Sequence, residues 1–437
     1  MNLKIIFFSI LSFVLSIQIF CQPRKELFLQ HILLSEIYIT PSSSPEGEQD
    51  STEQLYYIYK IPYNRLVFEK NDNRYTASYR LTVEVHDSLT NTISRKIKEN
   101  KISVDDFEKT DDGNIYTEGV LNFQILKNQK YKLIPVLYDA FSDREIRLNT
   151  IPIIPAKEEK NEHHRFLEPL VVNSVAQDLN NENSFILAGY NSCIPFSKEK
   201  YDLVIPCSDT SFQKIYVTLM DKEDTVFSSS IDKPFKLHNF IEESNGKVIL
   251  DNNGSVKLFN NFLIPYVNKN LPEGELTINI SFDKDSKPAA IFHKNVMWFN
   301  KPFSLMNPEL AIKLLKYMEG DTVIDSLLDF KKDNYSIVLF NYWKRFDPTP
   351  ETAFNELMKE YYTRIDYSMK NFSSITGRKG IDTDRGRIFI LYGKPSETMR
   401  SSNQLGKVVE TWVYKNPYRK FVFVDETGTG EYKLKTS

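Results

Sequence analysis

The sequence contains little glycine and almost no net charge, and each shortage argues against a class of protein. Only 15 of the 437 residues are glycine, which argues against glycine-rich repeats and phosphate-binding loops. The formal net charge is -3, so the chain has no overall basic field and we expect no nucleic-acid partner. The Gly-x-Ser-x-Gly, His-Glu-x-x-His and Walker patterns are missing, and we expect no cofactor and no bound metal. An active site assembled from distant segments stays open.

Long apolar runs are also scarce. Lys4 precedes the apolar stretch Ile5–Leu15, which is too short to span a membrane and is typical of a secretory signal. We expect a signal peptide over residues 1–21 and an exported protein that is periplasmic or associated with the outer membrane. The alternative is a lipoprotein with a lipid anchor at Cys21, although Phe20 stands where a lipobox has a small residue. No later run is long enough for a transmembrane helix.

Cysteine is rare, with three in the chain. Once Cys21 leaves with the signal peptide, Cys193 and Cys207 remain as an even pair. An even pair in an exported protein predicts a disulfide. The alternative is a zinc site, but two thiols without nearby histidine or further cysteine fall short of four ligands.

Aromatic residues are plentiful, with 24 Tyr and 30 Phe, and they favour β-structure. The clearest alternating run places four apolar side chains on one strand face: Tyr79, Leu81, Val83 and Val85. Short runs of this kind, separated by turn signals, predict an antiparallel, Ig-like β-sandwich over residues 24–153. Similar runs predict a second sandwich over residues 165–300, after a polar linker that contains His163 and His164.

The periodicity becomes helical at Asn307, which can cap a helix that starts with Pro308. Thr349 is expected to cap a longer helix, and we predict helices across residues 307–376. A small antiparallel sheet is expected over residues 387–434, with its first strand at Arg387. The predicted fold class is therefore mainly β, with two tandem sandwiches followed by an α+β domain over residues 307–437.

A loop of glycine, aspartate and arginine precedes that last sheet. The loop and the segment after it contain Gly380, Thr383, Asp384, Arg385, Gly386, Ile390, Leu391, Tyr392, Gly393 and Pro395. The helical segment before it contains Trp343, Arg345, Asp347, Pro348, Thr349, Tyr361, Tyr362 and Arg364. The residues after it include Glu410, Trp412, Tyr414, Phe423 and Asp425.

With these residues the C-terminal sequence resembles the GWxTD-domain family of exported proteins from Bacteroidota and related bacteria. Ile381 stands where the family has tryptophan. If that tryptophan contacts a ligand, this chain lacks the contact; if it only packs, isoleucine is an adequate substitute. The family has no established activity, so the resemblance implies an architecture and a compartment and no mechanism.

Eight residues are candidates for a binding site: Asp382, Asp384, Arg385, Arg387, Tyr392, Arg345, Asp347 and Arg364. The two loop carboxylates could form an acid/base pair or recruit a divalent cation. Alternatively, Asp382 caps a turn and Asp384 pairs with an arginine. Arg385 and Arg387 could bind an anionic glycan or a partner's carboxylate, or they could form internal salt bridges.

We therefore expect a non-enzymatic envelope protein that binds a protein partner or a surface glycan. The alternative is an exported hydrolase or glycan-active enzyme with its site around residues 380–395. An enzyme requires the candidate side chains to line an open, partly apolar pocket. A binding module predicts that they form mutual salt bridges and that an exposed apolar patch lies elsewhere.

Overall fold

The computed structural model describes residues 33–41, 52–154, 166–173, 184–188, 193–251, 258–284 and 286–436. The expected signal peptide, Cys21 and the two linker histidines lie outside these ranges. The chain divides into two compact units, Met1–Trp298 and Phe299–Ser437, and each is described by itself. Within the described ranges, no helix combines the length and the apolar character that crossing a membrane requires.

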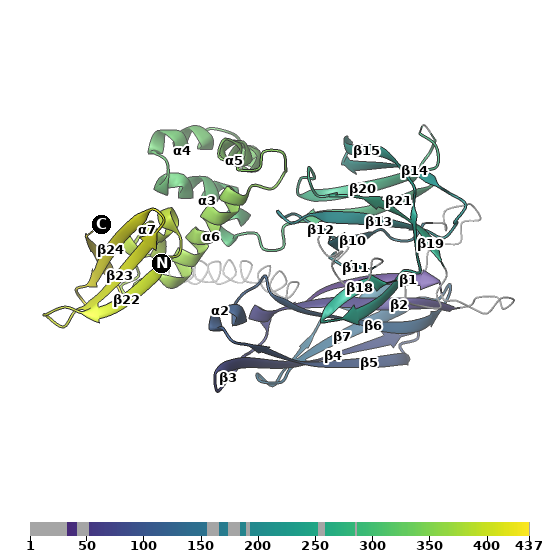
Figure 1. Cartoon of the computed structure of the whole chain (residues 1–437), viewed down its shortest axis with the longest axis horizontal. Coiled ribbons are helices and arrows are strands. Elements are labelled where there is room, and N and C mark those ends of the chain that lie inside the picture. Colours follow the sequence, from purple (N-terminus) through teal and green to yellow (C-terminus); the bar gives the residue numbers. More distant parts are fainter. Residues whose placement is uncertain are drawn as a thin grey trace, which may run out of the picture. The chain divides into compact units, whose positions relative to one another are not determined.

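The first part of unit 1 is a sandwich of two antiparallel sheets (Figure 1). One sheet has the strand order β1-β2-β6; the other has the order β3-β4-β7-β8, with β5 paired to β4 and β9 to β7. The strands are β1 Leu34–Pro41, β2 Thr52–Pro62, β3 Glu69–Asn71, β4 Arg74–His86, β5 Thr92–Val104, β6 Tyr116–Leu126, β7 Tyr131–Asp139, β8 Arg144–Arg147 and β9 Ile151–Ile153. Two short helices join them, η1 Tyr63–Arg65 and α2 Phe107–Thr110.

Alternation along β4 builds the core of this sandwich. The four apolar residues that the sequence places on one face are at most 1% exposed. They pack in one cluster with residues of β2, β6 and β7, such as Tyr57, Phe123 and Leu133, so both sheets contribute to one core. The expectation of a sandwich in this part of the chain is confirmed.

The second part of unit 1 holds three further sheets, with strand orders β10-β13-β19-β16, β11-β18-β17 and β12-β21-β20-β14-β15. Their strands are β10 Leu170–Asn173, β11 Phe185–Ile186, β12 Cys193–Pro195, β13 Tyr201–Cys207, β14 Lys214–Asp221, β15 Asp224–Asp232, β16 Phe235–Leu237, β17 Phe240–Ser244, β18 Lys247–Asp251, β19 Phe259–Ile264, β20 Gly274–Ser281 and β21 Ala290–Met297. All pairs are antiparallel except β12 with β21, which is parallel. The fold class, mainly β with tandem antiparallel modules, is confirmed.

The predicted disulfide between Cys193 and Cys207 is not formed, and both residues are buried as thiols. Their strands belong to different sheets, because β12 pairs with β21 while β13 pairs with β10 and β19. A disulfide needs the two Cβ atoms within about 4 Å, and neighbours in separate sheets meet this only when both point at each other. Burial raises the pKa of the Cys193 thiol to about 11, so this sulfur stays protonated at neutral pH.

A buried lysine lies where the two β-modules of unit 1 meet. Lys294 on β21 is 2% exposed, and its Nζ lies 2.8 Å from Oε1 of Glu168 and 3.8 Å from Oε1 of Glu36. Glu36 belongs to β1 of the first sandwich, so the ammonium connects both modules. Burial raises the pKa of Glu36 to about 7, against the lowering effect of the Lys294 charge.

Two more ion pairs link the same modules. Lys247 on β18 lies 3.2 Å from Glu118 on β6, whose side chain is 1% exposed. Lys98 on β5 lies 3.0 Å from Glu243 on β17. Among the described residues, three pairs of oppositely chargeable side chains therefore join the first sandwich to the second module.

Unit 2 begins with helices and ends with a sheet (Figure 1). Its helices are η4 Phe303–Met306, α3 Pro308–Lys313, η5 Leu314–Tyr317, α4 Asp321–Leu328, η6 Lys332–Asn334, α5 Tyr335–Lys344, α6 Glu356–Asn371, η7 Gly380–Asp382 and α7 Asp384–Tyr392. Its strands β22 Glu397–Ser402, β23 Val408–Lys415, β24 Tyr418–Asp425 and β25 Tyr432–Thr436 form an antiparallel sheet in chain order.

Two helix starts have different outcomes. The predicted cap at Asn307 is confirmed, because its side chain accepts a hydrogen bond from the backbone N–H of Leu310 at 3.0 Å. The predicted cap at Thr349 is wrong. The cap of α6 is Asn355, whose Oδ1 accepts from the N–H of Met358 at 2.8 Å. Thr349 instead begins a turn.

The predicted strand at Arg387 is also wrong, because residues 384–392 form α7 and the sheet begins at β22. Thr383 caps this helix: its Oγ1 accepts from the N–H of Gly386 at 3.1 Å. Gly393, with φ of 75°, ends it. A short apolar run cannot distinguish strand from helix, so the caps decide the outcome here.

The burial of Glu36 predicts a pH-dependent stability of unit 1. Its pKa is raised from 4.5 to about 7 in the folded state, so the folded state binds the proton more tightly. Stability should therefore fall as pH rises through this window. In the native chain the free energy of unfolding should decrease between about pH 5 and about pH 8. In Glu36→Gln we expect this decrease to be smaller by roughly 2 kcal/mol.

The measurement is urea unfolding at each pH, followed by hydrogen exchange of the β1 and β21 amides. Glu99→Gln is the matched control, because Glu99 lies on β5 with an exposed side chain. Equal pH dependence in the native chain and Glu36→Gln would show that Glu36 does not carry the effect.

Candidate functional site

The motif around Gly380 builds the start of a helix against α6. The hydroxyl of Thr383 donates to the carbonyl oxygen of Gly380 at 2.7 Å while it caps α7. A Cβ added at Gly380 would overlap the carbonyl oxygen of Ser368 on α6, and one at Gly386 would overlap the carbonyl oxygen of Gly380. Only glycine permits this close backbone approach at both positions.

Ile381, which replaces the family's tryptophan, is 5% exposed. It lies in η7 between the buried Gly380 and the half-buried Asp382. In this chain the position is therefore a packing position.

Asp384 and Arg385 fasten α7 to the sheet. Oδ2 of Asp384 accepts from the backbone N–H of Leu434 on β25 at 2.9 Å. The guanidinium of Arg385 lies 3.8 Å from the ring centroid of Tyr432 and 3.3 Å from a carboxylate oxygen of Glu410. Both side chains make contacts inside the domain, and neither lines the pocket described below.

Arg345 and Asp347 act locally after α5. Arg345 donates to Oε1 of Glu319 at 2.9 Å. Oδ1 of Asp347 accepts from the N–H of Thr349 at 2.9 Å, which explains the turn found there. Among the described residues neither is a partner of Asp384, so Arg345 is not the arginine considered for Asp384 from the sequence.

Arg364 and Tyr392 stabilise the end of α7. Arg364 pairs with Glu360 at 2.7 Å and donates to the carbonyl oxygen of Leu391 at 3.3 Å. This contact satisfies a carbonyl at the helix C-terminus, where positive charge is favourable. The ring of Tyr392 packs on Phe421 of β24 at 5.2 Å between centroids.

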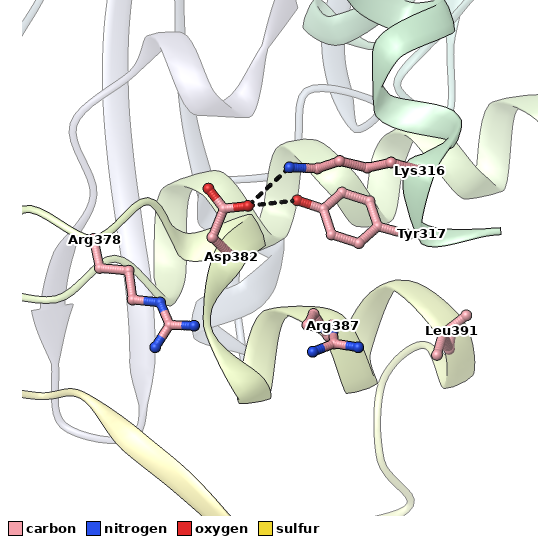
Figure 2. Close-up of a pocket in the computed structure, with 6 residues that line it drawn as sticks. All are labelled: Lys316, Tyr317, Arg378, Asp382, Arg387 and Leu391. Carbon is pink, nitrogen blue, oxygen red and sulfur yellow. Dashed lines mark hydrogen bonds and ion pairs between the residues drawn. The ribbon is translucent and has the colours of Figure 1, made fainter. Parts of the chain in front are cut away.

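The two remaining candidates line a pocket with a volume of about 380 Å³ (Figure 2). Its lining residues are Lys316, Tyr317, Arg378, Asp382, Arg387 and Leu391. They come from η5, the segment before η7, η7 itself and α7. Sequence reasoning proposed Asp382 and Arg387 as site residues but not the other four.

Asp382 is held by two neighbours from η5. Its Oδ1 accepts from Nζ of Lys316 and from the hydroxyl of Tyr317, both at 3.0 Å (Figure 2). Burial raises the pKa of Asp382, but the hydrogen bonds and the charges of Lys316 and Lys379 outweigh it and lower the pKa overall. The carboxylate therefore stays ionised at neutral pH.

The cationic residues differ in their partners. Arg378 pairs with Glu431 at 2.8 Å. Arg387 is exposed, and within the described residues its side chain makes no ion pair and no hydrogen bond. Three cationic side chains and one carboxylate thus line the pocket, and the guanidinium of Arg387 has its hydrogen-bonding capacity open to solvent.

The two loop carboxylates diverge. Asp382 faces the pocket, whereas Asp384 binds the backbone of β25. They do not form the acid/base pair considered from the sequence. In the described parts of the chain, no three His, Cys, Asp or Glu residues are grouped so that they could hold a metal ion.

Comparison with known families identifies this part of the chain. Residues 282–437 match the model of the GWxTD domain. The match is confined to the C-terminal part of the chain, and it includes the pocket and all eight candidate residues.

A search of curated proteins finds no match. Among solved structures, the C-terminal 282-residue fragment of intimin, in complex with the intimin-binding domain of the translocated intimin receptor, is 11% identical. The alignment covers 89% of this chain and 94% of that fragment, with a TM-score of 0.13. A score this low carries no argument about fold or function.

The hydrogen bond from Leu434 to Asp384 predicts a structural role for this carboxylate. We expect Asp384→Ala to lower the free energy of unfolding of unit 2 by about 2 kcal/mol, because it removes a hydrogen bond between α7 and β25 and a favourable charge at the first turn of α7. Asp384→Asn should cost less. Asp321→Ala is the control, since Asp321 is the acidic residue in the first turn of α4 and, within the described residues, makes no hydrogen bond to a strand. Unchanged thermal unfolding of Asp384→Ala would contradict the role.

The contacts of Asp382 predict the effect of removing its ammonium partner. Lys316→Met should raise the pKa of Asp382 toward its ordinary value, because it removes a hydrogen bond and a positive charge. The measurement is a ¹³C NMR titration of the carboxyl group. Lys313→Met, one turn earlier and paired with Glu309, should leave the midpoint unchanged. An unshifted midpoint in Lys316→Met would exclude this pair in solution.

Proposed function

We propose that this protein is an exported, non-enzymatic module of the cell envelope that binds a protein partner or a surface glycan. Within this proposal, the C-terminal unit recognises an anionic group of that partner. The periplasm or the outer membrane is its place of action, with a lipid anchor at Cys21 as the alternative to a soluble form.

The proposal rests mainly on the environment of Arg387. Its guanidinium lines the pocket without an acidic partner in the described part of unit 2. A guanidinium can bind a carboxylate through two parallel hydrogen bonds, which gives both orientation and affinity. Lys316 and Arg378 add positive charge at the same pocket, which favours an anionic ligand group.

Other contacts favour binding over catalysis. Asp384 is engaged by the backbone of Leu434, which leaves one carboxylate in the pocket. A general acid needs a carboxyl whose pKa is raised, whereas the pKa of Asp382 is lowered. The alternative of a hydrolase or glycan-active enzyme therefore has less support than a binding module.

A crosslinking experiment in the native host tests the proposal. A photo-crosslinking amino acid replaces Leu391, a half-exposed residue of the pocket, and a second version carries it at Leu405, which is 81% exposed on the β22–β23 turn. We expect one reproducible partner from position 391, identified by mass spectrometry. Arg387→Gln should reduce that product about tenfold, because it removes a charge-assisted contact.

Arg419→Gln serves as the control, since Arg419 is exposed and its guanidinium lies over Tyr392 outside the pocket. The proposal would be contradicted by an equal yield of the crosslinked product from position 405, or by a yield that Arg387→Gln does not change. Turnover of a glycan that depends on Asp382 would favour the enzyme.

A further inference from the structure

The pocket of unit 2 carries a second polar feature besides its positive charge. Lys316 and Tyr317 both donate their hydrogen bonds to the same carboxylate oxygen of Asp382, Oδ1. Oδ2 accepts no hydrogen bond within the described residues, and Figure 2 shows it turned away from both donors. An ionised carboxylate has about four acceptor positions, so Asp382 can accept from further donors.

A ligand that uses the whole pocket must therefore bring an anion and hydrogen-bond donors together. The anion would face the guanidinium of Arg387, and the donors would face Oδ2 of Asp382. A dianionic phosphate supplies a single hydroxyl donor, and its two negative charges are repelled by the carboxylate of Asp382. A monoanionic carboxylate is repelled less and fits the planar fork of arginine.

Two further features describe the remaining surface. Leu391 and the ring of Tyr317 line the pocket with apolar atoms. A volume of about 380 Å³ falls in the usual range for small-molecule sites. Sugar rings combine a C–H face with hydroxyl donors, and a sugar acid adds one carboxylate on the same ring.

We infer that the pocket formed by Lys316, Tyr317, Arg378, Asp382, Arg387 and Leu391 binds a sugar acid, of the hexuronate type found in acidic glycans. Arg387 binds its carboxylate, Asp382 accepts from neighbouring ring hydroxyls, and Leu391 packs against the ring. This inference rests on the proposed function and chooses the glycan over the protein partner, because an acidic peptide brings the carboxylate without a ring of hydroxyl donors.

The test is a calorimetric and NMR titration of the full chain with four probes: sodium D-glucuronate, D-glucose, inorganic phosphate and a glutamate-rich peptide. We expect glucuronate to bind about tenfold more tightly than each of the others, because it alone satisfies both Arg387 and Asp382. The amide signals of residues 378–392 should shift.

Two variants separate the roles of the residues. Arg387→Gln should weaken glucuronate about tenfold through loss of the charge-assisted contact. Asp382→Asn should also weaken glucuronate but strengthen phosphate, because it removes the repelling charge. Arg419→Gln should change neither. Arg387 is exposed and makes no ion pair in the described chain, so its variant is expected to fold, and a melting curve confirms this.

Any other outcome overturns the inference that the pocket binds a sugar acid. Phosphate that binds as tightly as glucuronate would make this a general anion site. Tighter binding of the peptide, dependent on Arg387, would make the ligand a protein carboxylate and would leave the binding module standing. If glucuronate does not bind but the crosslink at Leu391 depends on Arg387, only the sugar acid is wrong. If both fail, the proposed function is wrong as well.

Discussion

The close approach of two backbones at Gly380 and Gly386 determines the geometry of the C-terminal unit. No side chain separates η7 from α6 there, so Gly380 of η7 lies directly against the carbonyl of Ser368, and Gly386 of α7 lies against the carbonyl of Gly380. That contact fixes the position of Thr383, and Thr383 fixes the first turn of α7. The side of α7 that carries Phe389 then joins the aromatic core with Phe372 and Trp412, while Arg387 remains exposed at the pocket.

The charged residues of the motif have two kinds of role. Asp384 and Arg385 bind the sheet, Asp384 at β25 and Arg385 at Glu410, and these contacts keep α7 in place. Asp382 and Arg387 lie on either side of them in sequence and face the pocket. Since neighbouring residues of a helix point in different directions, a single short motif can both hold the domain together and present a binding surface.

Local rules predicted some parts of this structure and failed at others for identifiable reasons. Alternation in β4 and the cap at Asn307 depend on neighbours in sequence, and both are found. The apolar run after Arg387 satisfies strand and helix equally, and the deciding signals were the caps Thr383 and Gly393. Thr349 was also predicted to cap a helix, but it lies in a turn that is stabilised by its hydrogen bond to Asp347.

For a similar reason, the sequence predicted only part of the lining of the pocket. Asp382 and Arg387 stand in the motif, but Lys316 and Tyr317 reach Asp382 across 66 and 65 residues. Such contacts depend on how η5 packs against η7, and no spacing rule in a single sequence reveals them. The same holds for Cys193 and Cys207, where an even count said nothing about which sheet each strand joins.

The three ion pairs between the β-modules of unit 1 bear on how this protein could change over evolutionary time. A module moved into another chain would leave Glu118 and Lys294, both almost fully buried, each without one of its partners. Each would keep its other partner, Lys60 for Glu118 and Glu168 for Lys294, but losing part of a buried charge network is destabilising. We therefore expect the two modules of unit 1 to be inherited together, whereas exposed charges on unit 2, such as Arg387, can vary with the ligand.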